Sequence, residues 1–319
     1  MPKKVLILAG GGGHTGYGYA LAQRLYGSAS LHFLVPKGDE LSQRRLCKFG
    51  IVEELLKSRE TKTPLKEFIP NFVKSLLDSS GKVSRKYDVV VSTGSNFCLP
   101  PAMFAWLKGI PLINIESSVR FTKASKSTFL LQPFSKLTVL HWEEQRKLLK
   151  RGVVVGPLLP KPQVEPRKGR YILVTGGTYG HRALFDAVSE SSLAEVVLQT
   201  GKVSPDKYMR RHPEWKVIQY ATKFHELVAG AEVVVTHFGS TILEALVYRK
   251  PIVVVPNPEW TRTAGVEDAK YLAKKVNAVL VSEISPNKLL AAIEEARGRE
   301  LPVFPDGAQR LADIILKLM

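Results

Sequence analysis

Residues 233–257 read VVVTHFGSTILEALVYRKPIVVVPN, and this stretch specifies the architecture of the second half of the chain. Three consecutive valines lead into a His-Phe-Gly-Ser turn, an amphipathic run and a second valine-rich segment. The pattern predicts a strand, a turn, a helix and a strand, which is the repeating unit of a parallel β-sheet. Neither valine run alternates with polar residues, as expected for strands that are buried on both faces.

The turn inside this unit is a candidate phosphate site. Gly239 is expected to let the backbone turn tightly, so that Ser240 and Thr241 begin the helix at the carboxyl edge of the sheet. Backbone N–H groups and hydroxyls at a helix start can hold a phosphate without a metal ion. Glu244 follows one turn later, within reach of a ribose hydroxyl. The alternative interpretation is a capping box made by Thr241 and Glu244.

The chain opens with the same pattern of strand, glycine turn and helix. Val5–Ala9 is a predicted strand, and the glycines that follow fit G-x-G-x-x-G, the dinucleotide-binding fingerprint. An NAD site also needs an acidic residue at the end of the second strand, but Leu31–Val35 is followed by Pro36 and Lys37, which argues against a dehydrogenase. His14 stands at the strand-to-helix turn, a common position for an active-site residue.

Two further polar turns follow predicted strands in the first half. Thr93-Gly94-Ser95-Asn96 comes after the strand Asp88–Ser92, and Glu116 ends the strand Ile110–Ile115. By spacing, Glu116 and His14 are expected to face one another. They are the two candidates for a general base that accepts a proton from an attacking hydroxyl.

Composition limits the class of protein. A length of 319 residues and an apolar fraction of 45% suit two domains with separate cores. No apolar run reaches the ~18 residues of a membrane-spanning helix, no signal-peptide cleavage site is expected, and Cys47 and Cys98 suggest a reducing cytoplasm. Residues 1–160 carry a net charge of +13 and residues 161–319 only +4, so the basic half predicts a polyanionic partner. Zinc-finger spacing and RNA-binding aromatic motifs are missing, which disfavours nucleic acid.

Basic and apolar residues are interleaved in two segments of the basic half. Residues 57–86 should form short helices divided by Pro64 and Pro70, and residues 120–136 mix lysines with phenylalanine and leucine. This combination suits an anionic membrane surface, although a solvated surface helix with a core face would show a similar pattern. The apolar segment 97–109 is either a core helix or a segment that dips into lipid.

A proline-rich stretch at residues 156–170 is the expected interdomain linker. It separates a first domain, residues 1–157, from a second, residues 158–319, whose last helix could pack back on the first domain. Strand Tyr171–Thr175 and the turn Gly176–Gly180 repeat the opening of the chain, which predicts two Rossmann-like α/β domains. No D-x-D motif and no P-loop occurs, so backbone amides and hydroxyls should meet the charge of a diphosphate, and no metal or other cofactor is expected.

Several of these motifs resemble one family of enzymes. The runs GGGGHTGYGYALAQRL and IESSVR resemble the membrane-anchoring subunit of the N-acetylglucosaminyltransferase that acts second in dolichol-linked glycan assembly, and also the bacterial transferase that completes lipid II. The turns at residues 176–180 and 237–244 resemble the catalytic subunit of the same glycan transferase. The chain therefore looks like both subunits joined in one polypeptide of the GT-B fold, with mainly parallel sheets.

The resemblance implies an inverting transferase that moves N-acetylglucosamine from UDP-GlcNAc to a lipid-linked pyrophosphate sugar of the polyprenol or dolichol type, in N-glycan precursor assembly. Its partners would be the UDP-sugar, the polyprenyl-pyrophosphate acceptor and the cytoplasmic face of an anionic membrane, to which it binds peripherally. The implied catalytic residues are His14 and Glu116, with His14 favoured as the base. The implied donor-binding residues are Gly177, Thr178, Tyr179, Tyr220, His237, Gly239, Ser240, Thr241, Glu244, Asn257, Glu267 and Asp268. The implied acceptor-binding residues are Gly13, Thr15, Ser95, Asn96 and Arg120.

Three alternatives stay open at this point. The chain could transfer a sugar to another lipid acceptor, or act as a UDP-GlcNAc epimerase of the same fold that needs no membrane. It could also be a regulatory subunit that binds a sugar nucleotide without turning it over. An epimerase would be indifferent to a bilayer, and a regulator would bind UDP without forming a product.

Overall fold

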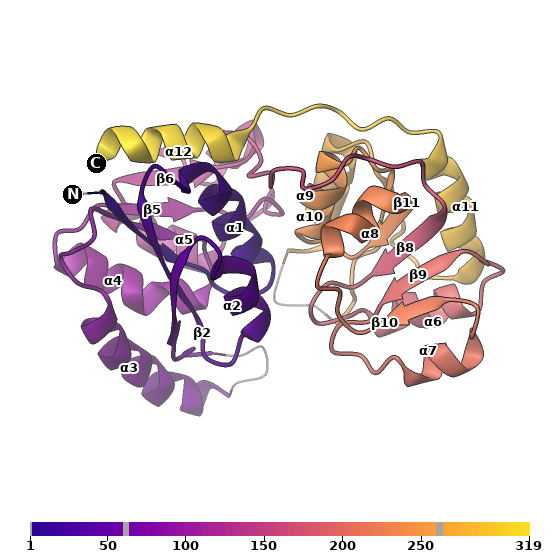
Figure 1. The fold of residues 1–319 in the computed structure, drawn as a ribbon, viewed down its shortest axis with the longest axis horizontal. Coiled ribbons are helices and arrows are strands. Elements are labelled where there is room, and N and C mark those ends of the chain that lie inside the picture. Colours follow the sequence, from indigo (N-terminus) through magenta and orange to yellow (C-terminus); the bar gives the residue numbers. More distant parts are fainter. Residues whose placement is uncertain (1, 60–63, 260–263) are drawn as a thin grey trace. The chain divides into compact units, whose positions relative to one another are not determined.

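Each half of the chain folds around one parallel β-sheet (Figure 1). The computed structural model describes residues 2–59, 64–259 and 264–319. The chain divides into a first unit, Met1–Pro160 with Phe304–Met319, and a second unit, Lys161–Val303. The fold is therefore α/β with two Rossmann-like sheets.

The first sheet has seven strands in the order β3-β2-β1-β4-β5-β6-β7, and each neighbouring pair is parallel. The strands are β1 Lys4–Leu8, β2 Ser30–Pro36, β3 Gly50–Leu55, β4 Val89–Ser92, β5 Leu112–Ile115, β6 Leu137–Leu140 and β7 Gly152–Val154. The strand order runs outward from β1 to β3, then resumes on the other side of β1 with β4. This reversal is a topological switch point, where ligands of open α/β sheets bind beyond the carboxyl ends of the strands.

Helices connect these strands and cover the sheet. They are α1 Gly13–Leu25, α2 Glu40–Leu46, α3 Leu65–Lys82, α4 Leu99–Leu107 and α5 Lys126–Leu131, with 3-10 turns η1 Asn96–Cys98, η2 Gln132–Phe134 and η3 Glu143–Lys147. One core cluster joins Leu6, Leu8 and Val90 of the sheet to Phe97 and Ala102 of the η1–α4 segment. Both faces of the central strands are covered, which is why β4 reads as an uninterrupted valine run.

The C-terminal helix α12, Gly307–Leu318, belongs to the first unit and packs against α1. The Arg24 guanidinium donates to the Asp306 carboxylate at 2.7 Å, and that carboxylate also caps α12 by accepting from the Gln309 backbone N–H. The backbone of Gly307 lies so close to Gly156 that a Cβ there would be 2.3 Å from the Gly156 carbonyl oxygen. The end of the chain is therefore seated beside the start of the linker.

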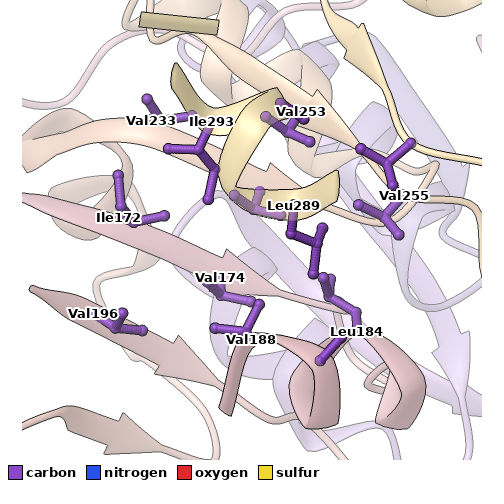
Figure 2. Close-up of a cluster of buried hydrophobic side chains, with 14 of the residues drawn as sticks. Ile172, Val174, Leu184, Val188, Val196, Val233, Val253, Val255, Leu289 and Ile293 are labelled. Atoms are coloured by element: carbon purple, nitrogen blue, oxygen red, sulfur yellow. The ribbon is translucent and has the colours of Figure 1, made fainter. Parts of the chain in front are cut away.

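The second sheet repeats the first with six parallel strands in the order β10-β9-β8-β11-β12-β13, so its switch point lies between β8 and β11. The strands are β8 Tyr171–Thr175, β9 Val196–Gln199, β10 Lys216–Ile218, β11 Ala231–Thr236, β12 Ile252–Val254 and β13 Val279–Leu280. The helices are α6 Arg182–Ser189, α7 Asp206–Arg211, α8 Phe224–Gly230, α9 Thr241–Val247, α10 Val266–Lys275 and α11 Pro286–Arg297. Figure 2 shows Leu289 and Ile293 of α11 among the valines of the sheet.

The structure differs from the sequence-based expectations in several elements. Helix α3 is continuous through Pro70, although Pro64 and Pro70 were expected to divide this segment. Pro70 lies near the start of the helix, and the later turns are held by buried side-chain contacts such as Ser75 Oγ to the Leu56 carbonyl oxygen. The charged segment between Trp142 and Arg151, for which the sequence predicts a helix, forms only the short turn η3. The edge strand β3, in which partly buried and exposed residues alternate, was not expected at all.

Candidate active site

Glycine turns occupy the switch point of each sheet. In the first unit these are the turn after β1, which leads into α1, and the turn after β4, which leads into η1. In the second unit they are the turns after β8 and β11. Because all strands within a sheet are parallel, both turns of each pair lie at one carboxyl edge, as expected for a ligand site.

His14 is the second residue of α1. It follows a turn in which Gly11 and Gly12 have positive φ angles of 83° and 54°. Its Nδ1 lies 2.8 Å from the Thr93 carbonyl oxygen. A carbonyl oxygen only accepts hydrogen bonds, so Nδ1 carries the proton and donates it. In the neutral ring Nε2 then keeps its lone pair, which is the form that a general base requires.

The surroundings of His14 favour this neutral form. Burial lowers the pKa of His14 below its ordinary value of 6.5, the hydrogen bond to Thr93 opposes that shift, and the positive charges of Arg120 and Lys57 lower it further. At neutral pH the ring is therefore uncharged. A half-buried neutral imidazole at a switch point is suited to accept a proton from a substrate hydroxyl.

The turn after β4 lies against the His14 ring. Gly94 has φ +79°, and a Cβ there would lie 2.9 Å from the Ile115 carbonyl oxygen and 3.5 Å from the His14 ring. Ser95 follows with φ 109° and ψ 159°, a region that is almost confined to glycine. Its N–H donates to Ser127 Oγ at 3.2 Å, and the Asn96 side chain is exposed.

Glu116 is fully buried, and its carboxylate binds its own loop. Oε1 accepts from the Ser117 N–H at 2.6 Å and Oε2 from the Ser125 N–H at 2.9 Å, so the carboxylate joins the two ends of the loop that carries Arg120. Burial raises the pKa of Glu116, against the effect of these two hydrogen bonds and of Arg120. Across the residues that the structure describes, no hydrogen bond joins Glu116 to His14. This geometry favours a positioning role for Glu116.

Two residues that the sequence analysis did not select also hold this loop. The Tyr17 hydroxyl accepts from the Ser118 N–H at 2.9 Å, and Gln145 Nε2 donates to the carbonyl oxygens of Ser117 and Arg120 at 2.8 and 2.9 Å. Tyr17 lies one helical turn after His14, and that spacing was a usable signal. Gln145 comes from a distant turn, and no local pattern marks it.

Thr15 was expected to contact the acceptor, but its side chain has a structural contact. The buried Thr15 Oγ1 lies 2.7 Å from Ser42 Oγ, which in turn donates to the Asp39 carboxylate at the start of α2. The hydroxyl therefore joins α1 to α2. Gly13 remains at the first position of α1, where its backbone N–H is available to a ligand.

In the second unit, the turn after β8 is locked to the turn after β9. Gly201 has φ +61°, and a Cβ there would lie 2.4 Å from the Gly177 carbonyl oxygen and 2.6 Å from that of Thr178. The Thr178 carbonyl oxygen accepts from the Lys202 N–H at 3.0 Å. Thr175 Oγ1 accepts from the Gly177 N–H at 3.1 Å. The two turns therefore form one compact support.

His237 lies between two glycines of different turns. A Cβ on Gly177 would be 2.6 Å from His237 Cε1, and one on Gly239 would be 2.4 Å from His237 Nε2. Gly239 was expected to allow a tight turn, but its φ is not positive, and the close approach of the imidazole explains its identity instead. Burial lowers the pKa of His237 to about 3, with a smaller contribution from His181, so the ring is neutral.

Helix α9 begins at Thr241, and the side chain of its N-cap residue, Ser240, makes no capping hydrogen bond. Glu244 is therefore the fourth residue of the helix, one position too late to form a capping box with Ser240, the residue that stands at the N-cap in place of Thr241. Its half-buried side chain lies on the first turn of α9, at the carboxyl edge of the sheet.

The remaining predicted donor residues have different surroundings. Tyr179 and Tyr220 are exposed, and the Tyr220 hydroxyl donates to the Thr178 carbonyl oxygen at 3.4 Å. Asn257 Oδ1 accepts from the Glu259 N–H.

The acidic pair at the start of α10 has two different surroundings. Glu267 pairs with Lys270 on the surface, and the buried Asp268 accepts from the Gly265 N–H and so caps α10. The Asp268 carboxylate therefore has a structural role that the sequence analysis did not foresee.

His181 was also missed, although it directly follows the predicted turn. Its buried Nδ1 accepts from the Leu184 N–H and caps α6. Within residues 2–59, 64–259 and 264–319, no group of three His, Cys, Asp or Glu side chains could hold a metal ion. None of the helices described is long and apolar enough to cross a membrane.

Comparison with known families divides the chain at the same linker. Residues 5–158 match the family "Oligosaccharide biosynthesis protein Alg14 like", and residues 171–312 match "Glycosyltransferase family 28 C-terminal domain". The chain is 24% identical over 293 residues to a UDP-N-acetylglucosamine–N-acetylmuramyl-(pentapeptide) pyrophosphoryl-undecaprenol N-acetylglucosamine transferase of Bacillus cytotoxicus, with 79% of each chain covered.

Solved structures share the fold over nearly the whole chain. The MurG structure of Acinetobacter baumannii has a TM-score of 0.67 at 18% identity, covering 99% of this chain and 100% of MurG. A UDP-GlcNAc 2-epimerase of Methanocaldococcus jannaschii has a TM-score of 0.68 at 15% identity, covering 98% and 99% of the two chains. At this level of identity, these likenesses support the two-domain GT-B fold.

Proposed function

This chain combines an Alg14-like domain with a glycosyltransferase family 28 C-terminal domain, and we propose that it transfers N-acetylglucosamine from UDP-GlcNAc to a lipid-linked pyrophosphate sugar. It is a UDP-N-acetylglucosamine-dependent glycosyltransferase of the GT-B fold. The observation that carries the finer proposal is the neutral His14, whose Nδ1–H is committed to Thr93 and whose Nε2 remains available at the switch point of the Alg14-like unit.

In the proposed reaction, His14 Nε2 accepts the proton of the acceptor hydroxyl. The hydroxyl oxygen attacks the anomeric carbon of the donor, the bond from that carbon to the diphosphate breaks, and UDP leaves with the bonding electron pair. Attack from the side opposite the leaving group inverts the configuration of that carbon. Glu116 positions the loop that carries Arg120 and leaves the proton transfer to His14.

The second unit supplies the donor site in this proposal. Backbone N–H groups of the turns after β8 and β11 would bind the diphosphate, with the hydroxyls of Thr178, Ser240 and Thr241 beside them. Glu244 would accept a hydrogen bond from the ribose, and Tyr220 would lie against the uracil. Asn257 and Glu267 are the proposed contacts to the donor sugar.

The acceptor pyrophosphate would be bound in the first unit, by the backbone at Gly13 and Ser95, the Asn96 amide and the Arg120 guanidinium. Arg120 lies near enough to His14 and Glu116 to shift the pKa of both. A positive charge at this distance attracts an anionic substrate.

A membrane surface is the proposed partner of helices α3, α4 and α5. The three helices are in contact in sequence order, and each exposes apolar side chains, among them Leu77, Trp106 and Phe129. Exposed lysines lie on the same segments, at positions 66, 74, 123, 126 and 136. Apolar residues interleaved with lysine suit an anionic bilayer, so we place the enzyme on the cytoplasmic membrane face as a peripheral protein.

For the acceptor we favour a polyprenol- or dolichol-linked sugar of N-glycan precursor assembly, with both subunits of that transferase joined in one polypeptide. The Alg14-like first half supports this choice over the muramyl acceptor named for the bacterial relative. Incubation with radiolabelled UDP-GlcNAc and polyprenyl-pyrophosphate acceptors carrying either GlcNAc or a muramyl peptide tests the proposal, with His14→Ala as the control. Epimerised donor without an acceptor product would indicate the epimerase, and UDP binding without turnover would indicate the regulator.

A further inference from the structure

The departing diphosphate of a sugar nucleotide gains negative charge, which hydrogen-bond donors, helix N-termini and cationic side chains can stabilise. The two buried histidines of the second unit cannot supply that charge. Burial lowers the pKa of both His181 and His237, to about 3 for His237, so both rings are neutral at neutral pH. A cationic side chain held at the turn after β8 would add a full positive charge to the backbone N–H groups there.

Lys202 is held at this turn by its backbone and by its side chain. Its N–H donates to the Thr178 carbonyl oxygen at 3.0 Å, and the neighbouring Gly201 packs tightly against the carbonyls of Gly177 and Thr178. Its Nζ lies over the ring of Tyr179, 4.8 Å from the ring centroid. The backbone contact holds the residue beside the segment Gly177–Tyr179, and the ring contact places its ammonium group over Tyr179.

The Lys202 ammonium has no competing carboxylate in the described part of the chain. Two other lysines of this unit are paired with carboxylates: Lys223 with Glu226 at 3.2 Å, and Lys207 with Asp186 at 2.9 Å. Lys202 is exposed, and its described partner is the face of Tyr179, which attracts a cation without cancelling its charge. The full positive charge is therefore available to an anion at the turn.

We propose that Lys202 binds the diphosphate of the sugar nucleotide and stabilises the charge of the departing UDP. The inference rests on the proposed donor site, and it adds a residue that neither the glycine turns nor Glu244 can replace. Backbone N–H groups orient the phosphate oxygens, while the ammonium group supplies a full charge. Tyr179 holds the lysine near the turn before the donor arrives.

Calorimetric titration with uridine, UMP and UDP separates the charge effect from folding. Lys202→Met removes the charge and keeps most of the chain length, Lys202→Arg keeps the charge, and Lys216→Met is the matched control at an exposed lysine of β10. We expect Lys202→Met to weaken UDP binding roughly 10-fold, equivalent to about 1.4 kcal/mol, and to leave uridine binding unchanged. Lys202→Arg should bind UDP nearly as well as the wild type. Lys216→Met should bind UDP with the affinity of the wild type.

Salt provides a second test. The preference of the wild type for UDP over uridine should shrink as ionic strength rises, and in Lys202→Met it should depend less on salt. Equal losses for uridine and UDP would mean that Lys202 only supports the turn, and unchanged UDP binding would also overturn the inference. If the wild type binds neither UDP nor UDP-GlcNAc, the proposed donor site itself fails. That result concerns the wild type and is therefore distinguishable from the two outcomes for Lys202→Met.

Discussion

A histidine acts as a base only while one ring nitrogen keeps its lone pair, and the Thr93 carbonyl selects that nitrogen in His14. Nδ1–H is held at 2.8 Å, which fixes both the tautomer and the direction of Nε2. Glu116 differs because both of its carboxylate oxygens already accept backbone hydrogen bonds. At the scale of single residues, the roles that we propose for the two candidates therefore differ.

Substitution of each candidate should separate these roles. His14→Ala should lower kcat by ~10²–10⁴-fold, the usual effect of losing a general base, with little change in thermal stability. Glu116→Gln should lower the melting temperature and have a smaller effect on kcat, because the amide nitrogen cannot accept one of the two backbone hydrogen bonds and the other is no longer charge-assisted. A Glu116→Gln enzyme without activity beside a fully active His14→Ala enzyme would reverse the assignment.

The acidic limb of the wild-type profile of kcat/KM against pH tests the same residue. The unprotonated ring is the active form, so the rate should fall as the pH drops through the pKa of His14. Burial lowers that pKa, so the midpoint should lie below 6.5. A midpoint above 6.5 would contradict the neutral environment described for His14.

The backbone at Ser95 is strained. A residue with a side chain at φ 109° costs of order 1–3 kcal/mol. Ser95→Gly should therefore raise the free energy of unfolding by about 1 kcal/mol in urea titrations, whereas Ser95→Ala, which keeps a Cβ, should not. We expect Ser95→Gly to lose activity, because the turn after β4, which lies against the His14 ring, becomes more mobile. A glycine variant that is no more stable than the wild type would show that the strain is absent.

At the scale of elements, helix α3 has an unusual distribution of side chains. Ser75 and Ser79 are fully buried, while Ile69, Val73 and Leu77, spaced four residues apart, are about half or more exposed. Residues four apart share one face of a helix, so these three form a single outward stripe. Exposing three apolar side chains on one face is unfavourable in water, which supports the membrane surface that we propose on that side.

Vesicle flotation tests this stripe. Replacing Ile69, Val73 and Leu77 together by serine should reduce recovery on anionic vesicles and leave stability nearly unchanged, because these side chains are exposed. A matched control replaces three exposed apolar residues of the second unit, Met209, Tyr271 and Val303, and should float like the wild type. Equal losses in both triple variants, or equal binding to neutral and anionic vesicles, would count against the membrane surface.

At the scale of the whole molecule, each unit contains a buried histidine whose pKa is about 3, His141 in the first and His237 in the second. His141 donates from Nε2 to the Glu116 carbonyl oxygen at 2.9 Å and accepts at Nδ1 from the Leu158 N–H at 3.3 Å. Both ring nitrogens are satisfied in the neutral form. Protonation would place a second donor against the Leu158 N–H and would weaken the contact between the loop and the linker.

Stability should therefore fall in mild acid. Between pH 6.5 and 3 the unfolded chain binds protons at these histidines and the folded chain does not, so each lost pH unit costs up to about 1.4 kcal/mol per histidine. Urea unfolding at pH 7.5, 6.0 and 5.0 should show decreasing stability, above the range where most carboxylates titrate. His141→Asn should be less stable at pH 7.5 but less dependent on pH. A constant free energy of unfolding from pH 7 to 5 would contradict this.

Local sequence patterns were sufficient for the central elements. The valine runs of β4 and β11 and the glycine turns after β1 and β8 predicted two parallel sheets, because a central strand and a tight turn each depend on a few adjacent residues. The same patterns brought His14 and the loop at 93–96 to one sheet edge. Short edge strands such as β3 and β13 have weak patterns and were missed.

The roles of individual side chains were decided by tertiary structure. His14 and Thr93 are 79 residues apart, and Gly177 and His237 meet across two turns, so no local pattern could show which ring nitrogen is bound or why Gly239 must lack a side chain. Asp268 caps α10, and the Thr15 hydroxyl binds Ser42, although the family pattern had suggested ligand contacts for both. The sequence by itself determined the repeated strands and the position of the turns, because those depend on near neighbours. Sheet order and burial, which depend on residues far apart in the chain, decided which groups remain available for chemistry.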